Sequence, residues 1–415
     1  MSELAILGGS KVVRLKMPAW PVVENAEKDA VAELMNSGRW WMGEKVEAFE
    51  RRYAEYHDAA FGIACCNGTV AIEMALAGCG IGAGDEVIVP PYSFIATASA
   101  VVTANAVPVF ADIEPDTLNL DTNAVEAAIT DRTRAILPVH FGGLPCDLDR
   151  ILEVARKHNL HVVEDAAHSW GTQWRGKGAG SWSDGGTFSF QMSKNMTSGE
   201  GGIFITSKQA VADRAWSYHH IGRVRDGQWY EHPLLGTNYR MTEFQAAILL
   251  CQLDRLESDV ALRERNAEAL NRRLAALPGF RLPRREPRVT RRAWHMYDVF
   301  FAPEHWEGAS RAQFLAALQA EGVPCSGGYG EPLYRQGVFQ RIAAGKAGCP
   351  FRCPFRNAPP PDYSRIRLPN AERAVQTSIW LPHAALLGTD DFIAQVSDAF
   401  EKLWTCRQEL IRVKS

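Results

Sequence analysis

The sequence predicts an α/β protein with a mostly parallel sheet and a second, smaller domain. Between residues 61 and 206, short apolar runs alternate with stretches of helical spacing, which is typical of parallel strands joined by crossover helices. The chain has 415 residues, of which 46% are hydrophobic and 22% charged, enough for a large core and more than one domain. We expect an N-terminal arm over residues 1–24, a large domain over 25–258 and a small C-terminal α/β domain over 259–415.

The composition argues against several classes of protein. A net charge of -3 provides no basic surface for nucleic acid or anionic membranes. We see no apolar run of membrane-spanning length and no export signal, so we expect a cytoplasmic protein without nucleic-acid or membrane partners. Nine cysteines, an odd number, are typical of reduced thiols. No metal site is expected at Cys325, Cys349 and Cys353, because their spacing fits no standard zinc pattern.

Two helices are predicted ahead of the sheet. After an irregular arm that ends near Val23, the first helix covers residues 25–37 and ends at Gly38. The second covers residues 44–56 and has an apolar stripe at helical spacing that is expected to pack in the core. The stripe consists of Val46, Phe49, Tyr53 and Tyr56.

The apolar runs predict the strands of the sheet. They cover residues 61–65, 86–90, 108–112, 134–140, 161–165, 187–190 and 202–206. Ligands of such sheets bind beyond the carboxyl ends of the strands. Three of these ends carry polar or flat side chains, at residues 67–69, 91–94 and 164–168.

Lys194 is the candidate catalytic residue. It follows the strand at 187–190 and precedes a glycine-rich turn at 198–202. A lysine at a strand end, surrounded by small residues, can reach into a cleft and form a Schiff base with a carbonyl, as lysine does with pyridoxal phosphate (PLP). For a lysine taken at random, a solvated loop position is the alternative.

Two neighbouring strand ends would suit PLP. Gly68 and Thr69 open a helix over residues 69–77, so backbone N–H groups and the Thr69 hydroxyl could face a phosphate, with an ordinary helix cap as the alternative. Asp165 ends an apolar strand, where a carboxylate is costly to bury unless a cation meets it. A protonated pyridine nitrogen would be that cation, and a helix N-cap is the alternative.

Three further side chains are candidates for the same site. Phe94 and His168 are flat groups that could enclose a ring between them, although a single aromatic residue beside a strand is usually packed in the core. Ser189 lies near the end of its strand and could add a hydroxyl to the phosphate site. In isolation it would be a core serine.

Four ordered motifs resemble the DegT-type (DegT/StrS) sugar aminotransferases, PLP enzymes of fold type I with an aspartate aminotransferase-like fold. The motifs are CNGTVAIEMAL, VVEDAAHSWG, FSFQMSKNMTSGEGG and GTNYRMTEFQAAI, at residues 66–76, 162–171, 188–202 and 236–248. The segments LAILGGSKV and WLPHAALLG are most similar to the branch acting on cyclitol ketones and related rings. That branch includes inosose aminotransferases and aminohydroxybenzoate synthases.

The resemblance implies a role for each candidate. Lys194 forms the Schiff base and Asp165 pairs with the pyridine nitrogen. His168, often glutamine in relatives, lies against the ring together with Phe94. Gly68, Thr69 and Ser189 hold the phosphate, and Asn238 reaches the phosphate of the neighbouring subunit, which implies a homodimer with shared active sites.

The resemblance also implies the reaction. An amino group moves from L-glutamine or L-glutamate to a ketone on a cyclitol or sugar ring by a ping-pong mechanism, in antibiotic or amino-sugar biosynthesis. One alternative is a dehydratase or cyclase on the same cofactor, including an aminohydroxybenzoate synthase-like enzyme. Some relatives have histidine in place of the lysine and act as sugar dehydratases, and Lys194 argues against that activity. The other alternative is a PLP-holding sensor without turnover.

The rest of the chain is expected to build the second domain. Two consecutive helices at residues 241–258 and 260–277 lead into it. A basic stretch at 281–292 is expected to be a solvated connector, with phosphate binding as the alternative. A strand at 294–301, a helix at 311–321, a proline-rich loop at 349–364 that shapes the substrate mouth and a closing helix at 390–413 follow.

Overall fold

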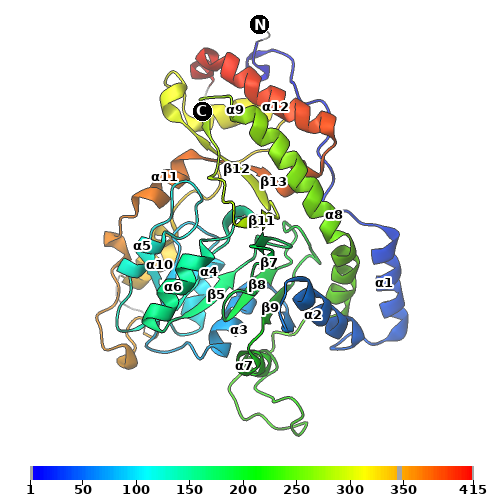
Figure 1. Cartoon of the computed structure of the whole chain (residues 1–415), viewed down its shortest axis with the longest axis vertical. Helices are drawn as coiled ribbons and strands as arrows, with labels where there is room; N and C mark the ends of the chain where they lie inside the picture. Colours follow the sequence, from blue (N-terminus) through cyan, green and yellow to red (C-terminus); the bar gives the residue numbers. More distant parts are fainter. Residues whose placement is uncertain (1–2, 344–347, 414–415) are drawn as a thin grey trace.

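The computed structural model describes residues 3–343 and 348–413 and has a seven-stranded sheet at its centre (Figure 1). The strand order is β1-β9-β8-β5-β4-β2-β3. Only β9 runs antiparallel to its neighbours, which confirms an α/β fold with a mostly parallel sheet. The strands are β1 (Phe61–Cys65), β2 (Glu86–Val89), β3 (Val107–Phe110), β4 (Thr133–Ile136), β5 (His161–Asp165), β8 (Gly185–Ser189) and β9 (Gly202–Thr206).

Helices cover both faces of this sheet, because side chains along each strand alternate between two apolar cores. In β9, Phe204 belongs to one core, whereas Ile203 and Ile205 belong to the other. The first face packs against α3 (Gly68–Gly78), α4 (Ala96–Thr103) and α7 (Gln209–His219). The second face packs against α2 (Glu44–Tyr56), α5 (Thr122–Ala127), α6 (Leu148–His158) and the first half of α8 (Glu243–Leu274). Helix α1 (Asn25–Ser37) lies on the outer side of α8.

Helix α8 differs from the two helices expected over residues 241–277. It is one continuous helix of 32 residues, opened by a capping box between Thr242 and Gln245. Ser258 and Asp259 do not interrupt it, because neither is a glycine or proline and the buried side chains of Leu256 and Val260 continue across them. One rigid element therefore runs from the large sheet to the upper part of the molecule (Figure 1).

A second core lies at the far end of α8. Its antiparallel sheet has the order β10-β12-β13, and the N-terminal arm contributes Leu4 and Val13 to its core. Glu321 fastens the arm, because its carboxylate accepts hydrogen bonds from the backbone N–H groups of Ala5 (2.8 Å) and Val12 (3.0 Å). The elements are β10 (Phe280–Arg281), β12 (Met296–Phe301), β13 (Ser378–Pro382), α9 (Arg311–Ala320) and α12 (Asp390–Thr405).

The remaining elements are short. Strands β6 (Gln173–Trp174), β7 (Lys177–Gly178) and β11 (Val289–Arg291) form a small sheet in the order β11-β6-β7. Helix α10 (Gly337–Ala343) lies beside the first core, and helix α11 (Pro369–Thr377) packs in a smaller cluster with residues of β12. The predicted closing helix ends at Thr405 and is followed by a 3-10 turn over Arg407–Arg412. Residues 1–2 of the predicted arm and 414–415 of the predicted small domain lie outside the described residues. The domain boundaries stay a prediction.

The basic stretch at 281–292 is not a solvated connector, so that prediction is wrong. Arg288 forms ion pairs with Asp147 (2.8 Å) and Asp149 (3.0 Å). Arg292 is buried, where it binds Asp298 (3.1 Å) and lies 3.7 Å from the ring centre of Trp294. These partners compensate the positive charges. All of them lie outside residues 281–292, so the composition of the stretch does not reveal them.

The proline-rich loop at 349–364 does not shape the substrate mouth, contrary to the prediction. It packs against the edge of the large sheet formed by β2 and β3. Arg356 forms a buried ion pair with Glu86 (2.7 Å), and the Tyr363 hydroxyl donates to the Pro108 carbonyl (2.8 Å). The loop therefore covers a sheet edge, which would otherwise expose unpaired backbone groups.

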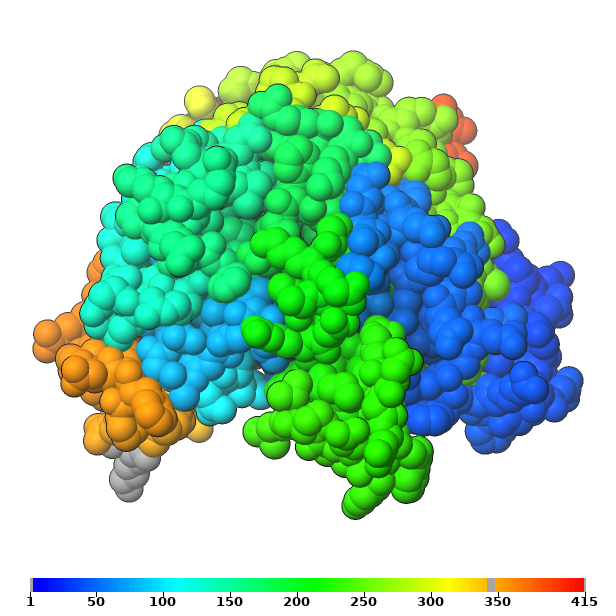
Figure 2. Space-filling model, turned by 60° about the horizontal axis from the view of Figure 1, so that its bottom comes forward, coloured from blue at the N-terminus to red at the C-terminus, as the bar shows by residue number. Residues whose placement is uncertain are grey.

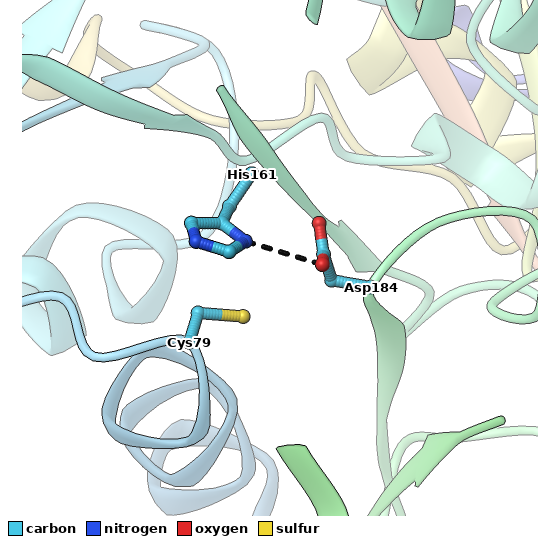
Figure 3. Close-up of side chains that lie close together, drawn as sticks. All are labelled: Cys79, His161 and Asp184. Carbon is cyan, nitrogen blue, oxygen red and sulfur yellow. Dashed lines mark hydrogen bonds and ion pairs between the residues drawn. The ribbon is translucent and has the colours of Figure 1, made fainter. Parts of the chain in front are cut away.

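Cys79, His161 and Asp184 come together where α3 ends and β5 and β8 begin, and Figure 3 shows the histidine and the carboxylate joined by a hydrogen bond. Their potential ligand atoms lie within 4.8 Å of one another, a grouping that sequence analysis did not identify. Lys208 already compensates the carboxylate, with Nζ 2.7 Å from Asp184 Oδ1. Burial, together with the Asp184 charge, raises the pKa of the Cys79 thiol to about 12, so the thiol stays protonated. We interpret the group as an ion-pair network that joins the strands.

Two features bear on the environment of the protein. Within residues 3–343 and 348–413, no helix is long and apolar enough to cross a bilayer. The described cysteines form no disulfide.

Glu164 fastens the strand that carries Asp165. Its buried carboxylate accepts hydrogen bonds from His140 Nε2 (2.9 Å) and from the backbone N–H groups of Gly180 (2.7 Å) and Trp182 (3.0 Å). Burial alone would raise the pKa of Glu164, but these partners, His140 above all, hold it below its usual range. The carboxylate therefore stays charged and ties the loop after β7 to β5.

We predict that Glu164→Gln destabilises the protein by about 2–4 kcal/mol, because an amide cannot accept all of these hydrogen bonds and leaves buried donors unpaired. The measurement is the free energy of unfolding in urea. Glu153→Gln is the matched control, because Glu153 pairs with Arg150 on the exposed surface of α6 and its loss should cost less than about 1 kcal/mol. Equal effects of the two changes would contradict this role for Glu164.

Candidate active site

A cavity of about 1010 Å³ opens at the carboxyl ends of the parallel strands and reaches the second sheet. This is where an α/β sheet is expected to bind its ligand. Seven of the eight predicted site residues line it, and these are Gly68, Thr69, Phe94, Asp165, His168, Ser189 and Lys194. The structure therefore brings together residues that lie up to 126 positions apart in sequence, from Gly68 to Lys194.

Lys194 lies in the turn between β8 and β9. Its Nζ is 5.8 Å from the ring centre of Trp170. Burial lowers the pKa of Lys194 to about 8, and the negative charge of Asp165 partly opposes this effect. A much larger fraction of the amine is therefore neutral near pH 8 than for an exposed lysine, and the neutral form is the one that attacks a carbonyl.

Asp165 ends β5 and is 5% exposed. Its Oδ2 accepts a hydrogen bond from Thr97 Oγ1 (2.8 Å) and its Oδ1 from the backbone N–H of Ala167 (3.2 Å). Burial raises the pKa of Asp165, while these donors and the charge of Lys194 lower it. These two donors fix the orientation of the side chain, and among the described residues it has no ion-pair partner in contact.

Gly68 and Ser189 meet at the N-terminus of α3. A Cβ on Gly68 would lie 2.6 Å from Ser189 Cβ and 3.0 Å from its Oγ, so only glycine lets the helix start this close to the end of β8. The Asn67 side chain caps α3 by accepting from the Val70 N–H (3.1 Å). The cavity wall thus combines the positive end of a helix with the hydroxyls of Thr69 and Ser189, a combination that suits an anion such as phosphate.

His168 is buried and lines the cavity. Its Nδ1 accepts from the Gly142 N–H (3.4 Å), which places the ring proton on Nε2. Burial, and then the charge of Lys194, lower the pKa of His168 well below its ordinary value, so the ring is neutral. His295 stacks on one face of the ring at 4.3 Å, and Phe94, 58% exposed, lies at the open side of the cavity.

Asn238 does not line the cavity of its own chain. It is exposed and pairs with His220 in an isolated β-bridge, beyond a segment that projects below α7 in Figure 1 and forms the projecting green lobe in Figure 2. Its predicted contact with the phosphate of a neighbouring subunit stays a prediction.

Sequence analysis missed several cavity residues. Thr97 was missed because a threonine inside a helical stretch has no distinguishing pattern. His295 and His383 come from the second sheet, at the start of β12 and just after β13. A polar residue beside an apolar strand was the signal that identified Asp165, and the same signal in residues 294–301 and 378–383 could have found these histidines.

The residues present fit PLP. Asp165 is a buried carboxylate without an ion-pair partner in contact among residues 3–343 and 348–413, and a protonated pyridine nitrogen would supply one. Gly68 lets the N-terminus of α3 approach Ser189 closely, and this helix end with the hydroxyls of Thr69 and Ser189 suits the phosphate. Lys194, with its lowered pKa, is the amine that can hold the carbonyl carbon.

Comparison with known proteins agrees with this chemistry. The profile of the DegT/DnrJ/EryC1/StrS aminotransferase family matches residues 21–401. A putative L-glutamine:3-amino-2,3-dideoxy-scyllo-inosose aminotransferase from Streptoalloteichus tenebrarius is 38% identical over 410 residues, covering 97% of this chain and 98% of the relative. An L-glutamine:2-deoxy-scyllo-inosose aminotransferase from Streptomyces kanamyceticus is 37% identical over 428 residues, covering 97% of each chain.

A solved structure supports the fold assignment. The crystal structure of 3-amino-5-hydroxybenzoic acid synthase superposes with a TM-score of 0.81 at 33% identity, covering 93% of this chain and 99% of that protein. The predictions of a fold type I enzyme and of PLP as cofactor are confirmed.

We predict that the cofactor-free protein captures PLP at a rate that rises with pH and levels off above about 8, because only the neutral amine of Lys194 reacts. For an exposed lysine the rise would continue toward about pH 10. The measurement is the appearance of yellow colour after mixing, followed by borohydride reduction and peptide mapping. The label should lie on Lys194 and be absent from Lys194→Ala, whereas Lys157→Ala on α6 should behave like the parent. A label on another lysine would contradict the assignment.

Proposed function

The chain belongs to the DegT/DnrJ/EryC1/StrS aminotransferase family, and we propose that it moves an amino group from L-glutamine to the ketone of a free cyclitol ring. The carrying observation is the cavity in which Lys194 and Asp165 meet beneath a helix N-terminus. The names of the two inosose aminotransferases support the donor and the acceptor. They also support a role in aminocyclitol antibiotic biosynthesis, and the absence of disulfides among the described cysteines supports a cytoplasmic location.

Each cavity residue has a task in this reaction. Bound PLP supplies the electron sink at the α carbon of the donor. Lys194 Nζ holds the cofactor and carries a proton, for which a pKa of about 8 is suited near neutral pH. Asp165, oriented by Thr97 and Ala167, keeps a proton on the ring nitrogen. His168 supports the ring from one side, and Gly68, Thr69 and Ser189 bind the phosphate.

A sugar dehydratase is not favoured, because a lysine occupies position 194. A cyclase is not favoured, because the two named inosose relatives are aminotransferases. A sensor without turnover is not favoured either, because Lys194 and Asp165 line a cavity whose volume leaves room for substrates beside the cofactor.

We further propose that the protein is a homodimer in which Asn238 contributes to the partner's site. The segment before Asn238 exposes Trp229 (78%), Tyr230 (79%) and Leu235 (94%). Large apolar side chains exposed together on a projecting segment favour burial against another surface. A two-fold axis would place the same segment against both cavities.

The proposed reaction predicts that the PLP-loaded protein loses its yellow colour with L-glutamine, releases a 2-oxo acid and recovers the colour with 2-deoxy-scyllo-inosose. A nucleotide-linked keto-sugar is the comparison acceptor and should be a much poorer one. Asp165→Asn should keep PLP but slow the glutamine half-reaction by far more than threefold, because the ring nitrogen loses its counter-charge. A change within threefold, which is about 0.6 kcal/mol of barrier, would remove Asp165 from this role. Preference for the nucleotide-linked ketone would refute the acceptor class.

The shared site predicts complementation between two inactive variants. Lys194→Ala and Asn238→Asp subunits should regain activity when mixed, because one hybrid site receives Lys194 from one chain and Asn238 from the other. Aspartate is chosen because its charge would repel the phosphate. Each parent must first be inactive alone, and sizing of tagged chains must show subunit exchange. Hybrids that form without regaining activity would show that Asn238 does not serve a partner's site.

A further inference from the structure

Two polar side chains flank Lys194 in the turn between β8 and β9. Gln191 lies shortly after β8, Glu200 lies shortly before β9, and both line the cavity. The backbone N–H of Phe190 donates to the Gly201 carbonyl (2.8 Å), so the two chain segments are still paired where these side chains begin. Gln191 and Glu200 therefore enter the cavity from adjoining backbone positions, on the edge that carries Lys194.

The hydrogen bonds of Gln191 fix which end of its amide is free. Its Oε1 accepts from the backbone N–H of Ser193 (2.8 Å) and from the Ser193 hydroxyl (2.8 Å). A backbone N–H can only donate, so the atom that faces it is the amide oxygen. The amide nitrogen, with two N–H donors, has no hydrogen-bond partner in residues 3–343 and 348–413. It is the part of the side chain that is left for a ligand.

Glu200 offers the opposite kind of group. Its side chain is exposed, and within the part of the chain that the structure describes its carboxylate accepts no hydrogen bond and forms no ion pair. Its backbone is held in place, because the Glu200 carbonyl accepts from Ser198 Oγ (2.8 Å) and from Gln245 Nε2 (2.8 Å). The turn thus presents an oriented amide donor and a carboxylate acceptor to the same edge of the cavity.

A donor and an acceptor on one edge match neighbouring hydroxyl groups of a ring. The proposed acceptor is such a ring, so this inference rests on the proposed function. Each hydroxyl group can both donate and accept, so one can accept from the amide while the next donates to the carboxylate, which forms the stronger hydrogen bond. The charge of Glu200 would repel the α-carboxylate of an amino-acid donor. The pair therefore suits the uncharged acceptor.

We propose that Gln191 and Glu200 determine the specificity for the acceptor by binding two neighbouring hydroxyl groups of its ring. Gln191 Nε2 donates to one hydroxyl oxygen, and the Glu200 carboxylate accepts from the other hydroxyl. Because both side chains belong to the turn that carries Lys194, the ring is held at the edge of the cavity where the amino group is transferred. A cyclic ketone without hydroxyl groups makes neither contact and is a poor acceptor.

The test measures the dissociation constants of two unreactive rings by calorimetry on the PLP-loaded protein. The ring alcohol scyllo-inositol has a hydroxyl group on every carbon and no ketone, whereas cyclohexanol has a single hydroxyl group. The parent should bind scyllo-inositol at least about tenfold more tightly than cyclohexanol. Gln191→Glu keeps the acceptor for Ser193 but removes the donor, and Glu200→Ala removes the carboxylate. Each change should lower the preference about three- to tenfold.

An exchange of the two groups separates hydrogen bonding from a structural role. The double variant Gln191→Glu, Glu200→Gln again has one donor and one acceptor. Because a hydroxyl group can take either role, this variant should regain most of the preference that Gln191→Glu loses. Failure to regain it, with PLP still bound, would contradict the proposed hydrogen bonds.

Two surface variants and the cofactor serve as controls. Gln209→Glu, in the exposed first turn of α7, and Glu153→Gln, in an exposed pair on α6, should both match the parent. Gln191→Glu and Glu200→Ala should still turn yellow with PLP. A Gln191→Glu protein that folds but captures no PLP would show that Gln191 serves the cofactor, and the proposal would be wrong.

The unreactive rings also separate this proposal from the proposed function, because their binding requires no amino transfer. A parent that binds both alcohols equally, or single variants that keep the preference, overturns the hydroxyl site whether or not glutamine is a donor. If the preference is present and depends on Gln191 and Glu200, the hydroxyl site stands. Failure of glutamine to react would then concern the donor identity alone.

Discussion

A buried carboxylate, Asp165, and a buried amine, Lys194, line one cavity, and the surrounding strands and hydrogen bonds fix their positions. Asp165 is held by Thr97 and Ala167 but has no ion-pair partner in contact within the described part of the chain, while burial lowers the pKa of Lys194 to about 8. Each group opposes the shift that burial imposes on the other. The parallel sheet makes this possible, because the carboxyl ends of its strands converge on one edge and bring residues from distant segments together.

Helix α8 connects that edge to the second sheet. Its first half packs on β8 and β9, and its second half packs in the core of β12, so the histidines of the second sheet have a fixed position relative to Lys194. His295 shows the consequence, because its Nδ1 donates to Asn195 next to the lysine (3.0 Å) while its ring stacks on His168. A single helix thus fixes the position of the second sheet, with His295, relative to the large sheet, with Lys194.

The sequence identified the cavity residues at the ends of the parallel strands, but it missed those that come from the second sheet. Lys194, Asp165 and Gly68 each lie at a strand end with a local pattern that has a chemical meaning, and all three line the cavity. His295 and His383 stand beside apolar strands, a signal that the sequence analysis did not use there, and nothing local distinguished Arg263 within its helical stretch. The two wrong predictions, for residues 281–292 and 349–364, have the same cause. Arg288 and Arg356 bind carboxylates 139 or more positions away in sequence, and charge counting along a stretch does not reveal such partners.

By itself, the sequence determined the class of fold, most of the strands and several residues that line the cavity, Lys194 among them, because periodicity and turn residues act over a few positions of the chain. Only the tertiary structure decided which charges are compensated. Asp184 has Lys208 as its partner, whereas Arg263 has no hydrogen-bond partner among the described residues. Compensation depends on distance in space and on burial, which the packing of helices against sheets sets. For that reason, only the folded chain shows which charges are compensated.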